Sequence, residues 1–291
     1  MIKRQNLEEQ LRLFRELMDI MSAMKNLALT ELRKLNRYLS TQERVVATIE
    51  RAAKDFVSHH PLPLLPGEPP RPWIVLVGSE RGFCGGFNEA VLDGLARHLA
   101  LSPGAADPRL VAVGRRLCNK LAGDPRLAAE VDGAAVVDEV DDVLQRMVKT
   151  FASLPGEGDP LFLLGLTVLH HTHEGETGAE AIAAFRPIGP FIAQPRQYGT
   201  PPRLHLPPRE FMGELIDQYV FAALHGAIYQ SLMAENRWRL RQTEGALSRM
   251  ERRMLEWQQR VNLLRQEEIT EEIEEIMLSV EAIERPLVPG R

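Results

Sequence analysis

Residues 7–56 read LEEQLRLFRELMDIMSAMKNLALTELRKLNRYLSTQERVVATIERAAKDF, and this stretch decides the fold of the chain. Two series of residues run through it, each with a spacing of seven, and they interleave at steps of four and three. The first series is Leu7, Phe14, Met21, Ala28, Leu35, Gln42, Ile49 and Phe56, and the second is Leu11, Met18, Lys25, Leu32, Leu39, Val46 and Ala53. All of these positions except Gln42 and Lys25 are apolar, and the stretch contains neither proline nor glycine. A heptad pattern of this length predicts one long helix in a coiled coil.

A second long helix is predicted near the C-terminus, from about Glu210 to Arg285, where the chain has no proline. Its apolar stripe is Leu240, Leu247, Met250, Met254, Trp257, Val261 and Leu264, and after a slip of one residue it resumes at Ile269, Ile273, Ile276, Val280 and Ile283. Prolines in residues 61–67 and Pro286 end the two helices, because proline lacks the amide donor that a helix interior needs. Exposure of either apolar stripe to water is unfavourable, so we expect the two helices to pack against each other. Because the chain must return across the middle region, we expect the two helices to be antiparallel. The C-terminal helix is the longer one, so its end should extend beyond the N-terminal helix without a helical partner.

The middle of the chain alternates between apolar runs and helical patterns. Runs at residues 73–77, 110–113 and 161–164 are apolar at successive positions, which is typical of parallel strands covered on both faces. Helical spacing follows Asn88, which we expect to be an N-cap, and recurs from Val140 to Phe151. These patterns predict a small α/β domain.

The expected organisation is therefore an N-terminal coiled-coil helix at residues 1–58, an α/β domain at residues 70–200 and a C-terminal coiled-coil helix at residues 209–286. The segment from Phe185 to Pro208, which is rich in proline and glycine, is interpreted as a linker or irregular edge.

Composition excludes several classes of protein. The chain has 291 residues, a net charge of -5 and a pI near 6.0, which argues against a nucleic-acid or polybasic membrane binder. No apolar run approaches the roughly 20 residues that span a bilayer, and the first residues lack a signal-peptide core. Two cysteines provide no disulfide framework. We expect a soluble cytoplasmic protein.

The most conspicuous short motif is GSERGFCGGFN at residues 78–88, between a predicted strand and a predicted helix. Phosphate-binding loops occupy such positions, but the spacing lacks both G-x-G-x-x-G and a lysine followed by serine or threonine. We interpret Gly82, Gly85 and Gly86 as residues of a structural turn, with nucleotide binding as a minor alternative.

Other residues of chemical interest form no catalytic constellation. A zinc site could be composed of His170, His171, His173, Glu174 and Glu176. A solvated loop is the favoured interpretation, because one short tract rarely supplies a whole ligand shell. Cys84 has no local histidine to act as a base and is expected to be a small packed residue. We expect no catalytic residues, no cofactor and no metal.

Two charged features have both a structural and a functional interpretation. The acidic run at residues 267–276 is typical of a solvated helix face, but it would suit a basic or hydrogen-bonding partner around the end of the helix. Lys25, at a core-facing position, either extends its amine to solvent or fixes the register of the seam.

Three separated motifs together resemble the gamma subunit of F-type ATP synthases. Ala23-Met24-Lys25, followed by Leu27, Ala28, Leu32 and Arg33, is similar to the family pattern A-M-K-M-V-A with K-L-R-R. Residues 80–88 are similar to D-R-G-L-C-G-G-x-N. Asn262, Arg265, Gln266, Ile269, Thr270, Glu272, Glu275 and Ile276 match N-x-x-R-Q-x-x-I-T-x-E-x-x-E-I without a gap. Upstream, Ala234, Glu235 and Arg239 fit S-E-x-x-A-R.

This resemblance covers nearly the whole chain and implies a fold and a task. The fold is a long antiparallel two-helix coiled coil, built from both termini, with a small α/β (Rossmann-like) domain. The task is that of the central rotor shaft, inside a ring of alpha and beta subunits and beside the epsilon subunit and the c-ring. It implies that Arg265, Gln266, Thr270 and Glu272 meet a loop of one beta subunit, and that Met24 and Lys25 belong to a neighbouring rotor–stator contact.

The resemblance also implies a peripheral protein on the cytoplasmic face of a bacterial inner membrane, without direct insertion and without nucleic acid. The chain departs from the family at Asn26, Glu31, residues 247–250, residues 277–279 and residues 205–207, which indicates a divergent bacterial branch. Two alternatives stay open at this point: a passive coiled-coil scaffold, and a nucleotide-binding α/β enzyme with helical arms.

Overall fold

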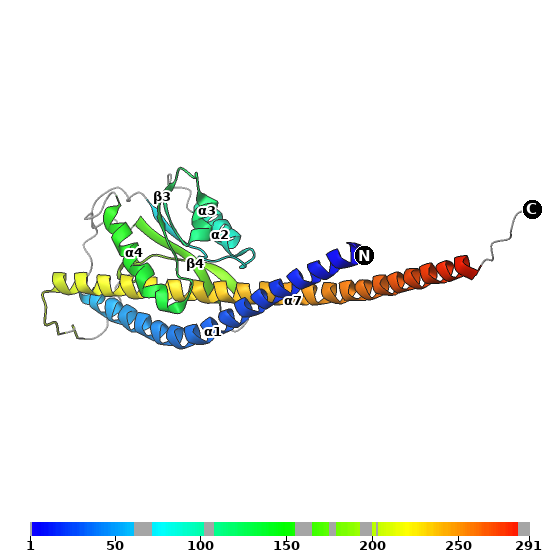
Figure 1. Ribbon diagram of the computed structural model, residues 1–291. Coiled ribbons are helices and arrows are strands. Elements are labelled where there is room, and N and C mark those ends of the chain that lie inside the picture. The colour runs from blue at the N-terminus through cyan, green and yellow to red at the C-terminus, as the bar shows by residue number, and fades with distance from the viewer. Residues whose placement is uncertain are drawn as a thin grey trace, which may run out of the picture. The chain divides into compact units, whose positions relative to one another are not determined.

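The computed structural model describes residues 2–60, 72–101, 108–154, 165–174, 179–192, 200–201 and 203–284. The chain begins and ends in a long helix, and a five-stranded sheet with shorter helices lies between the two in the sequence (Figure 1). In chain order the elements are α1 (Ile2–His59), β1 (Trp73–Val77), α2 (Phe87–Leu101), β2 (Arg109–Val113), α3 (Arg115–Leu121), β3 (Leu127–Val131), the 3-10 helix η1 (Val137–Glu139), α4 (Val140–Ser153), β4 (Leu166–Glu174), β5 (Ala179–Phe185), α6 (Gly189–Ile192) and α7 (Pro208–Glu284).

Both long helices are confirmed, with ends within a few residues of those predicted. α1 ends at His59, two residues before Pro61, and all fifteen heptad positions are buried or half-buried. α7 runs from Pro208 to Glu284. Pro208 stands at the first position of the helix, where its missing N–H is not needed.

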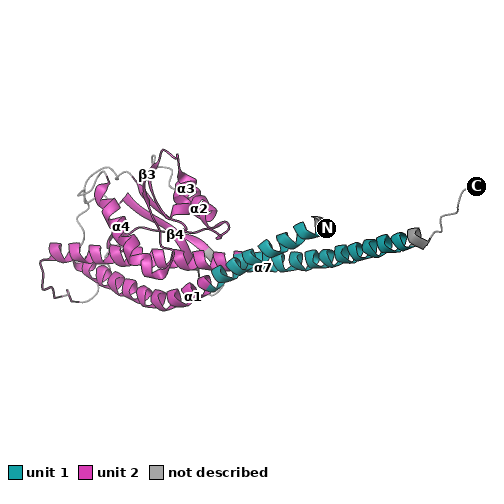
Figure 2. Ribbon diagram, in the orientation of Figure 1, with its two compact units in different colours: residues 1–26, 243–291 teal, residues 27–242 magenta. Residues whose placement is uncertain are grey.

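The chain divides into two compact units, drawn in different colours in Figure 2. Unit 1 contains residues 1–26 and 243–291, and unit 2 contains residues 27–242. α1 and α7 each contribute one part to each unit.

Within each unit the two helices are antiparallel, as predicted. In unit 1 the pairs are Arg4 with Glu268 (Nε to Oε2, 2.8 Å), Phe14 with Trp257 (ring centroids 5.0 Å apart) and Lys25 with Glu244 (Nζ to Oε1, 3.0 Å). In unit 2 they are Tyr38 with Tyr229 (ring centroids 5.9 Å), Gln42 with Ala222 (Nε2 to the carbonyl oxygen, 2.9 Å) and Glu50 with Tyr219 (Oε1 to the hydroxyl, 3.0 Å). In both sets, residue numbers rise along α1 as they fall along α7.

The side chains at the two polar heptad positions, Lys25 and Gln42, both contact α7. The Lys25 amine reaches the edge of the seam, where it is about one-third exposed and meets Glu244. The Gln42 side chain donates to a backbone carbonyl of α7. A polar group that has one suitable partner in a seam makes shifted registers unfavourable.

The sheet of unit 2 has the strand order β3-β2-β1-β4-β5, in which the first four strands are parallel and β5 is antiparallel to β4. The strands predicted at residues 73–77 and 110–113 are confirmed. The third predicted run, residues 161–164, lies outside the described residues, and β4 begins at Leu166. The interpretation of Phe185 as the start of a linker was wrong at its first residue, because Phe185 ends β5 and pairs with Val168.

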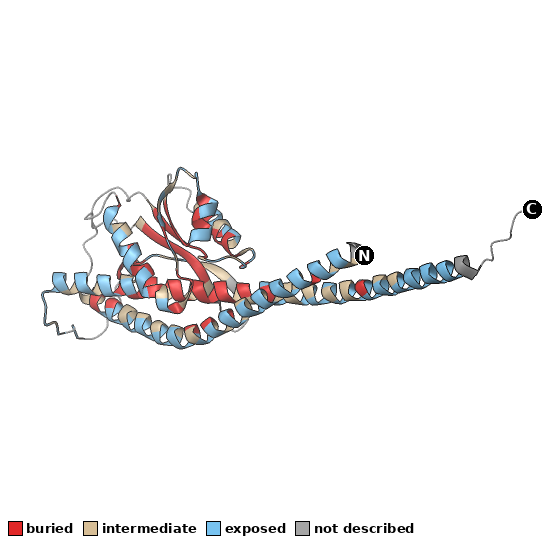
Figure 3. Ribbon diagram, viewed as in Figure 1, coloured by how far each residue is buried: buried red, intermediate tan, exposed pale blue. Residues whose placement is uncertain are grey.

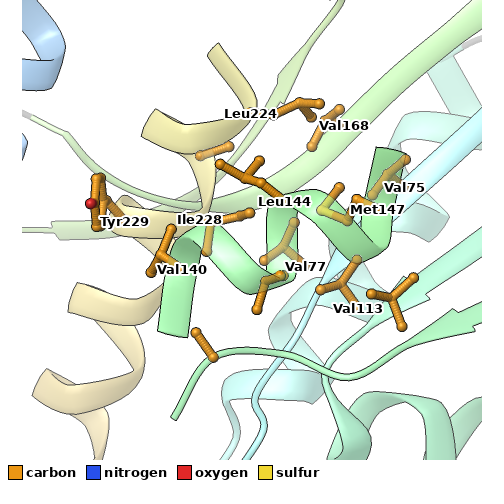
Figure 4. Packing of buried hydrophobic residues seen from close by; sticks show 14 of the residues in the cluster. Val75, Val77, Val113, Val140, Leu144, Met147, Val168, Leu224, Ile228 and Tyr229 are labelled. Carbon is orange, nitrogen blue, oxygen red and sulfur yellow. The ribbon is translucent and has the colours of Figure 1, made fainter. Parts of the chain in front are cut away.

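Alternating residues of the strands supply two cores. Val75 and Val77 of β1 face a large cluster formed with α4 and α7, as Figure 4 shows with Leu144 and Ile228. The other face of the sheet packs against α2 and α3. Buried side chains are accordingly dense along the sheet and along the part of α7 that lies in unit 2 (Figure 3). Coverage of both faces explains why the strands read as continuous apolar runs.

The prediction that Asn88 is the N-cap of α2 was wrong. α2 begins at Phe87, so Asn88 lies inside the helix. Its side-chain oxygen accepts from the backbone N–H of Ser79 at 2.9 Å, and its side-chain nitrogen donates to the Ser79 hydroxyl at 2.8 Å. Asn88 therefore ties the helix to the end of β1 instead of capping it.

Candidate functional site

The residues for which the sequence predicted an external contact lie in unit 1, and those on α7 are exposed. Arg265, Gln266, Thr270 and Glu272 all have exposed side chains. The Thr270 hydroxyl donates to the carbonyl oxygen of Gln266 at 2.9 Å, so these two residues form one local group on the helix surface. By helical geometry, Arg265 and Glu272, seven residues apart, share one side of the helix, and Gln266 and Thr270 share an adjacent side.

Solvent-exposed apolar side chains surround these polar residues. Ile269, Ile273, Ile276 and Val280 are between 48% and 62% exposed. The pair of Arg4 and Glu268 lies close to the start of α1, and every residue of α7 from 269 to 280 is exposed. The prediction that α7 outruns α1 is confirmed within unit 1. An exposed apolar stripe of this kind marks an interaction surface.

Met24 and Lys25 are half-buried on α1 in the same unit. Lys25 pairs with Glu244, which precedes Arg265 by 21 residues on α7. At 1.5 Å per residue this separation is about 30 Å along the helix. The structure thus places all six predicted contact residues in one unit, but in two groups that are well separated.

One departure from the family pattern has a structural explanation. Glu31 is almost fully buried in unit 2, accepts the backbone N–H of Val137 at 2.9 Å and lies 3.4 Å from the Lys34 amine. Lys34 also contacts Asp138 at 3.1 Å. This carboxylate and amine bind α1 to the turn that begins α4.

A second candidate site surrounds the glycine turn after β1, and α7 contributes two charged residues to it. Arg239 forms an ion pair with Glu235, and both are nearly inaccessible to solvent. Arg239 also bonds to Asn236 at 2.8 Å and approaches the Gly82 carbonyl oxygen at 3.4 Å. The backbone N–H groups of Arg81 and Glu80 lie near Glu235 and favour its charged form, although neither forms a hydrogen bond with it. Burial raises the pKa of the Glu235 carboxyl to about 7, while Arg239 and the two backbone donors oppose that rise.

The three glycines of the predicted turn differ in what they do. Gly85 has a φ of +56°, and an added Cβ would lie 2.7 Å from the Gln242 amide nitrogen. Gly82 and Gly86 lie outside the left-handed region, and Gly86 faces the ring of Trp238. Phe83 has a φ of +61° and is 58% exposed. A bulky residue in that region is strained, so the turn is held in place by its surroundings.

Cys84 is a packed residue of this turn. It is buried and donates to the Ser79 hydroxyl at 3.3 Å. Burial raises the pKa of its thiol, and the hydrogen bond with Ser79 opposes the rise only in part. The thiol form is favoured at neutral pH, which is unsuitable for a nucleophile.

The favoured interpretation of the histidine tract was wrong, because His170 and His171 lie on β4 and are buried. His171 stacks on Phe87 with ring centroids 3.8 Å apart, and its Nε2 lies 2.9 Å from the Phe87 carbonyl oxygen. Burial lowers the pKa of His171 to about 4, so the ring is neutral. Glu176 lies outside the described residues, and in the part of the chain that the structure describes no cluster suits a metal ion.

A polar cavity of about 760 Å³ opens beside the glycine turn, next to the carboxyl ends of β1, β2 and β3. Its charged lining residues are four arginines and four carboxylates: Arg81, Arg115, Arg116, Arg146, Glu80, Asp132, Glu139 and Asp142. These charges balance, so the cavity offers no net positive field for the phosphates of a nucleotide.

Sequence reasoning missed the interior role of Glu235 and Arg239. Their spacing of four places them on one side of a helix, but an acid and a base at that spacing are common on solvated helices. The signal that could have located them is their position among small and apolar neighbours, since residues 231–234 read SLMA.

In the residues that the structure describes, no helix is both long enough and apolar enough to cross a membrane.

Comparison with known proteins gives a consistent result. The family model described as ATP synthase matches residues 3–283. The ATP synthase gamma chain of Salinispora tropica is 26% identical over 304 residues, which covers 94% of this chain and 97% of that protein. The gamma chain of a Parafrankia species is 26% identical over 257 residues, or 83% of each chain.

Solved structures share the fold. A chain of the Euglena gracilis mitochondrial ATP synthase, from an assembly of OSCP, F1 and c-ring, aligns with a TM-score of 0.62 at 17% identity, over 99% of this chain and 98% of that one. A chain of the Tetrahymena thermophila central stalk and c-ring aligns with a TM-score of 0.51 at 15% identity, over 78% of this chain and 99% of that one. Because the family model matches nearly the whole chain, the protein belongs to the ATP synthase family, as a gamma subunit.

Proposed function

We propose that this chain is the central rotor shaft of an F-type ATP synthase and couples ion flow through a membrane ring of c subunits to ATP synthesis or hydrolysis on a ring of alpha and beta subunits. The observation that carries the proposal is the exposed stretch of α7 at residues 269–280, which extends beyond the start of α1. Apolar and acidic side chains alternate along the helix in this stretch. A soluble helix that needed no partner would not keep this stripe in water.

The coupling follows from asymmetry. A ligand or partner shifts a conformational equilibrium only through contacts that differ between the two states. A helix pair within a three-fold ring presents a different side to each beta subunit, so each beta subunit is biased toward a different conformation. Rotation exchanges these contacts in sequence. Changing a two-state site from one extreme to the other takes several kcal/mol of differential interaction.

In this proposal the rotor–stator contacts are Arg265, Gln266, Thr270 and Glu272 on α7, with Met24 and Lys25 as a second group on α1. The chain supplies no catalytic residue of its own. Segments 1–58 and 209–286 form the shaft, and segment 70–200 is the part that meets the epsilon subunit and the c-ring. The assembly is peripheral, at the cytoplasmic face of a bacterial inner membrane.

The test uses the assembled complex with the double variant Arg265→Ala/Gln266→Ala. We expect ATP-driven ion pumping to fall severalfold, while the thermal midpoint of the isolated chain stays unchanged because both side chains are exposed. The matched control is Gln259→Ala/Arg260→Ala, which removes the same two residue types from exposed positions one and a half turns earlier. Equal pumping by both double variants would contradict the assignment of these residues.

The two alternatives have separate tests. A nucleotide-binding enzyme would bind ATP as an isolated chain, and calorimetry on the full-length protein should instead give no heat of binding, given the balanced charges of the polar cavity. A passive scaffold would tolerate the Arg265→Ala/Gln266→Ala variant in every assay of coupling.

A further inference from the structure

In unit 1, the positions of α7 that face α1 follow a regular heptad, and their chemistry changes where α1 begins. Steps of three and four residues alternate through Leu247, Met250, Met254, Trp257, Val261, Leu264, Glu268, Glu271 and Glu275. The apolar members are buried or half-buried, and Trp257 lies against Phe14 of α1 with ring centroids 5.0 Å apart. Glu268 meets Arg4, close to the start of α1. Beyond this pair the same side of α7 is acidic, so it offers no apolar surface to a further helix packed in line with α1.

A different side of α7 becomes apolar at the same point. Its apolar stripe consists of Ile269, Ile273, Ile276 and Val280, which are between 48% and 62% exposed. Since successive residues of a helix are turned by about 100°, the stripe and the glutamates at positions 268, 271 and 275 point in directions about 150° apart. One heptad before Ile269, the side of the stripe carries Asn262, which is polar and exposed. The apolar stripe is therefore a separate surface and not a continuation of the contact with α1.

The charge of α7 changes sign in the same place. Residues 243–266 contain five arginines and three glutamates, whereas residues 267–284 contain eight glutamates and no lysine or arginine. Glu271, Glu272, Glu274 and Glu275 are exposed, as the end of the helix in Figure 3 shows. Several of them stand three or four residues apart, a spacing at which like charges destabilise a helix. An isolated helix gains nothing from this arrangement, so a partner outside the chain accounts for it best.

The two sides together limit the chemistry of that partner. A second copy of the chain would bring a second set of glutamates against the first, and an anionic membrane surface would repel the same side chains. A protein surface that combines apolar side chains with lysine or arginine is complementary to both sides of the helix.

We propose that the end of α7 is a two-sided contact within the ring of alpha and beta subunits. The apolar stripe packs against apolar side chains of the ring, while Glu271, Glu274 and Glu275 lie against basic side chains of the ring. This inference rests on the proposed rotor function. Because the two sides point in nearly opposite directions, different subunits of the ring meet them at any one moment. The end of the shaft therefore favours particular orientations within the ring.

The test measures how fast the assembled complex releases this chain on dilution, at low salt and in 1 M salt. For Glu271→Gln/Glu274→Gln/Glu275→Gln we expect release about tenfold faster than wild type at low salt, because three exposed ion pairs are lost. In 1 M salt, where the Debye length is about 3 Å, the two proteins should behave alike. Ile273→Gln/Ile276→Gln removes part of the apolar stripe and should accelerate release by the same factor at both salt concentrations.

The matched control is Glu16→Gln/Glu251→Gln/Glu256→Gln, which removes three carboxylates from exposed positions elsewhere in unit 1. It should be released like wild type. Equal release of the control and of the variant at the end of α7, or an isoleucine variant that is released like wild type, would overturn the inference alone. Failure of the wild-type chain to assemble with alpha and beta subunits would overturn the rotor function and this inference with it.

Sedimentation of the isolated chain tests the other occupant of the apolar stripe. We expect wild type to be monomeric at low salt and in 1 M salt. A dimer that Ile273→Gln/Ile276→Gln abolishes would assign the stripe to a second copy of the chain and contradict the proposal. The thermal midpoints of all variants should equal that of wild type, because every substituted side chain is exposed.

Discussion

The helix α7 contains two stretches with opposite patterns of solvent exposure: one buries polar side chains, and the other exposes apolar ones. In unit 2, residues 231–239 bury polar side chains, including Glu235 and Arg239, among apolar ones. In unit 1, residues 269–280 leave isoleucines exposed to solvent beside glutamates. Buried polar groups are retained when each has a partner inside the fold, whereas exposed apolar groups in a stable helix imply a partner outside it. The first stretch therefore holds the molecule together, and the second is available to another molecule.

Among the variants that test this contrast, we expect Arg239→Ala to cause the largest loss in the free energy of unfolding. It leaves Glu235 buried with no counter-ion, and loss of one member of a buried pair costs about 3–5 kcal/mol. Chemical denaturation at pH 8 should show a loss of that size. The loss should shrink at pH 5, where the pKa of about 7 lets the carboxyl bind a proton and become neutral.

The control for this variant is Arg252→Ala, at an exposed position of the same helix. Surface substitutions usually change stability by no more than about 0.5 kcal/mol. A similar loss for both arginines would mean that the Arg239 side chain has no special role.

A comparison of two isoleucines separates the two stretches directly. Ile228 is 3% exposed and packs between the sheet and α4, whereas Ile276 is 62% exposed. Ile228→Ala should cost about 2–5 kcal/mol, through lost burial and the cavity left behind. Ile276→Ala should change the free energy of unfolding by less than about 0.5 kcal/mol and should instead weaken ATP-driven pumping in the complex.

The outcome that would contradict this prediction is equally specific. A loss of stability for Ile276→Ala as large as that for Ile228→Ala, measured on the isolated chain, would show that the end of α7 is buried in the free subunit.

The buried histidine of unit 2 predicts a pH dependence. His171 has a folded-state pKa of about 4 against an ordinary value of 6.5. Between these values the unfolded chain binds a proton that the folded chain does not, so stability is lost as the pH falls from about 6.5 to 4. The contribution is about 3 kcal/mol at 1.36 kcal/mol per pKa unit.

The measurement is the free energy of unfolding of wild type and His171→Phe at pH 7, 5.5 and 4.5. The ring of phenylalanine retains the stacking on Phe87 but cannot bind a proton. The variant should therefore lose less stability than wild type between pH 7 and 4.5. Parallel slopes would show that His171 is not responsible.

The two stretches of α7 also show what sequence can predict. Strong periodicity gave the long helices, and continuous apolar runs gave β1 and β2, because burial on one stripe or on both faces leaves a direct mark on residue order. β3 was missed because LAAEV at residues 127–131 has weak alternation, with Val131 its most buried residue. β5 was missed because alanine-rich AEAIAAF resembles a helix more than an edge strand.

The burial of Glu235 and of the paired histidines could not be read from the chain for a different reason. Their burial depends on partners that are far away in sequence: Glu235 meets Glu80 and Arg81, and His171 meets Phe87. Residue type alone predicts exposure for a glutamate and a solvated tract for consecutive histidines. Only the tertiary fold supplies the donors and the ring that make burial favourable.

The smallest expected effect concerns Lys25, whose exposure is intermediate between those of the two stretches. Its amine meets Glu244 at 3.0 Å, with the two side chains 34% and 50% exposed. Exposed ion pairs contribute about 0–1 kcal/mol and are screened by salt. Lys25→Gln, which keeps the length of the side chain to within one atom, should therefore lower the free energy of unfolding by less than about 1 kcal/mol. The difference from wild type should vanish in 1 M salt. A double-mutant cycle with Glu244→Gln isolates the pair, and a coupling energy that persists at high salt would show that Lys25 is desolvated like Arg239 and belongs to the interior of the seam.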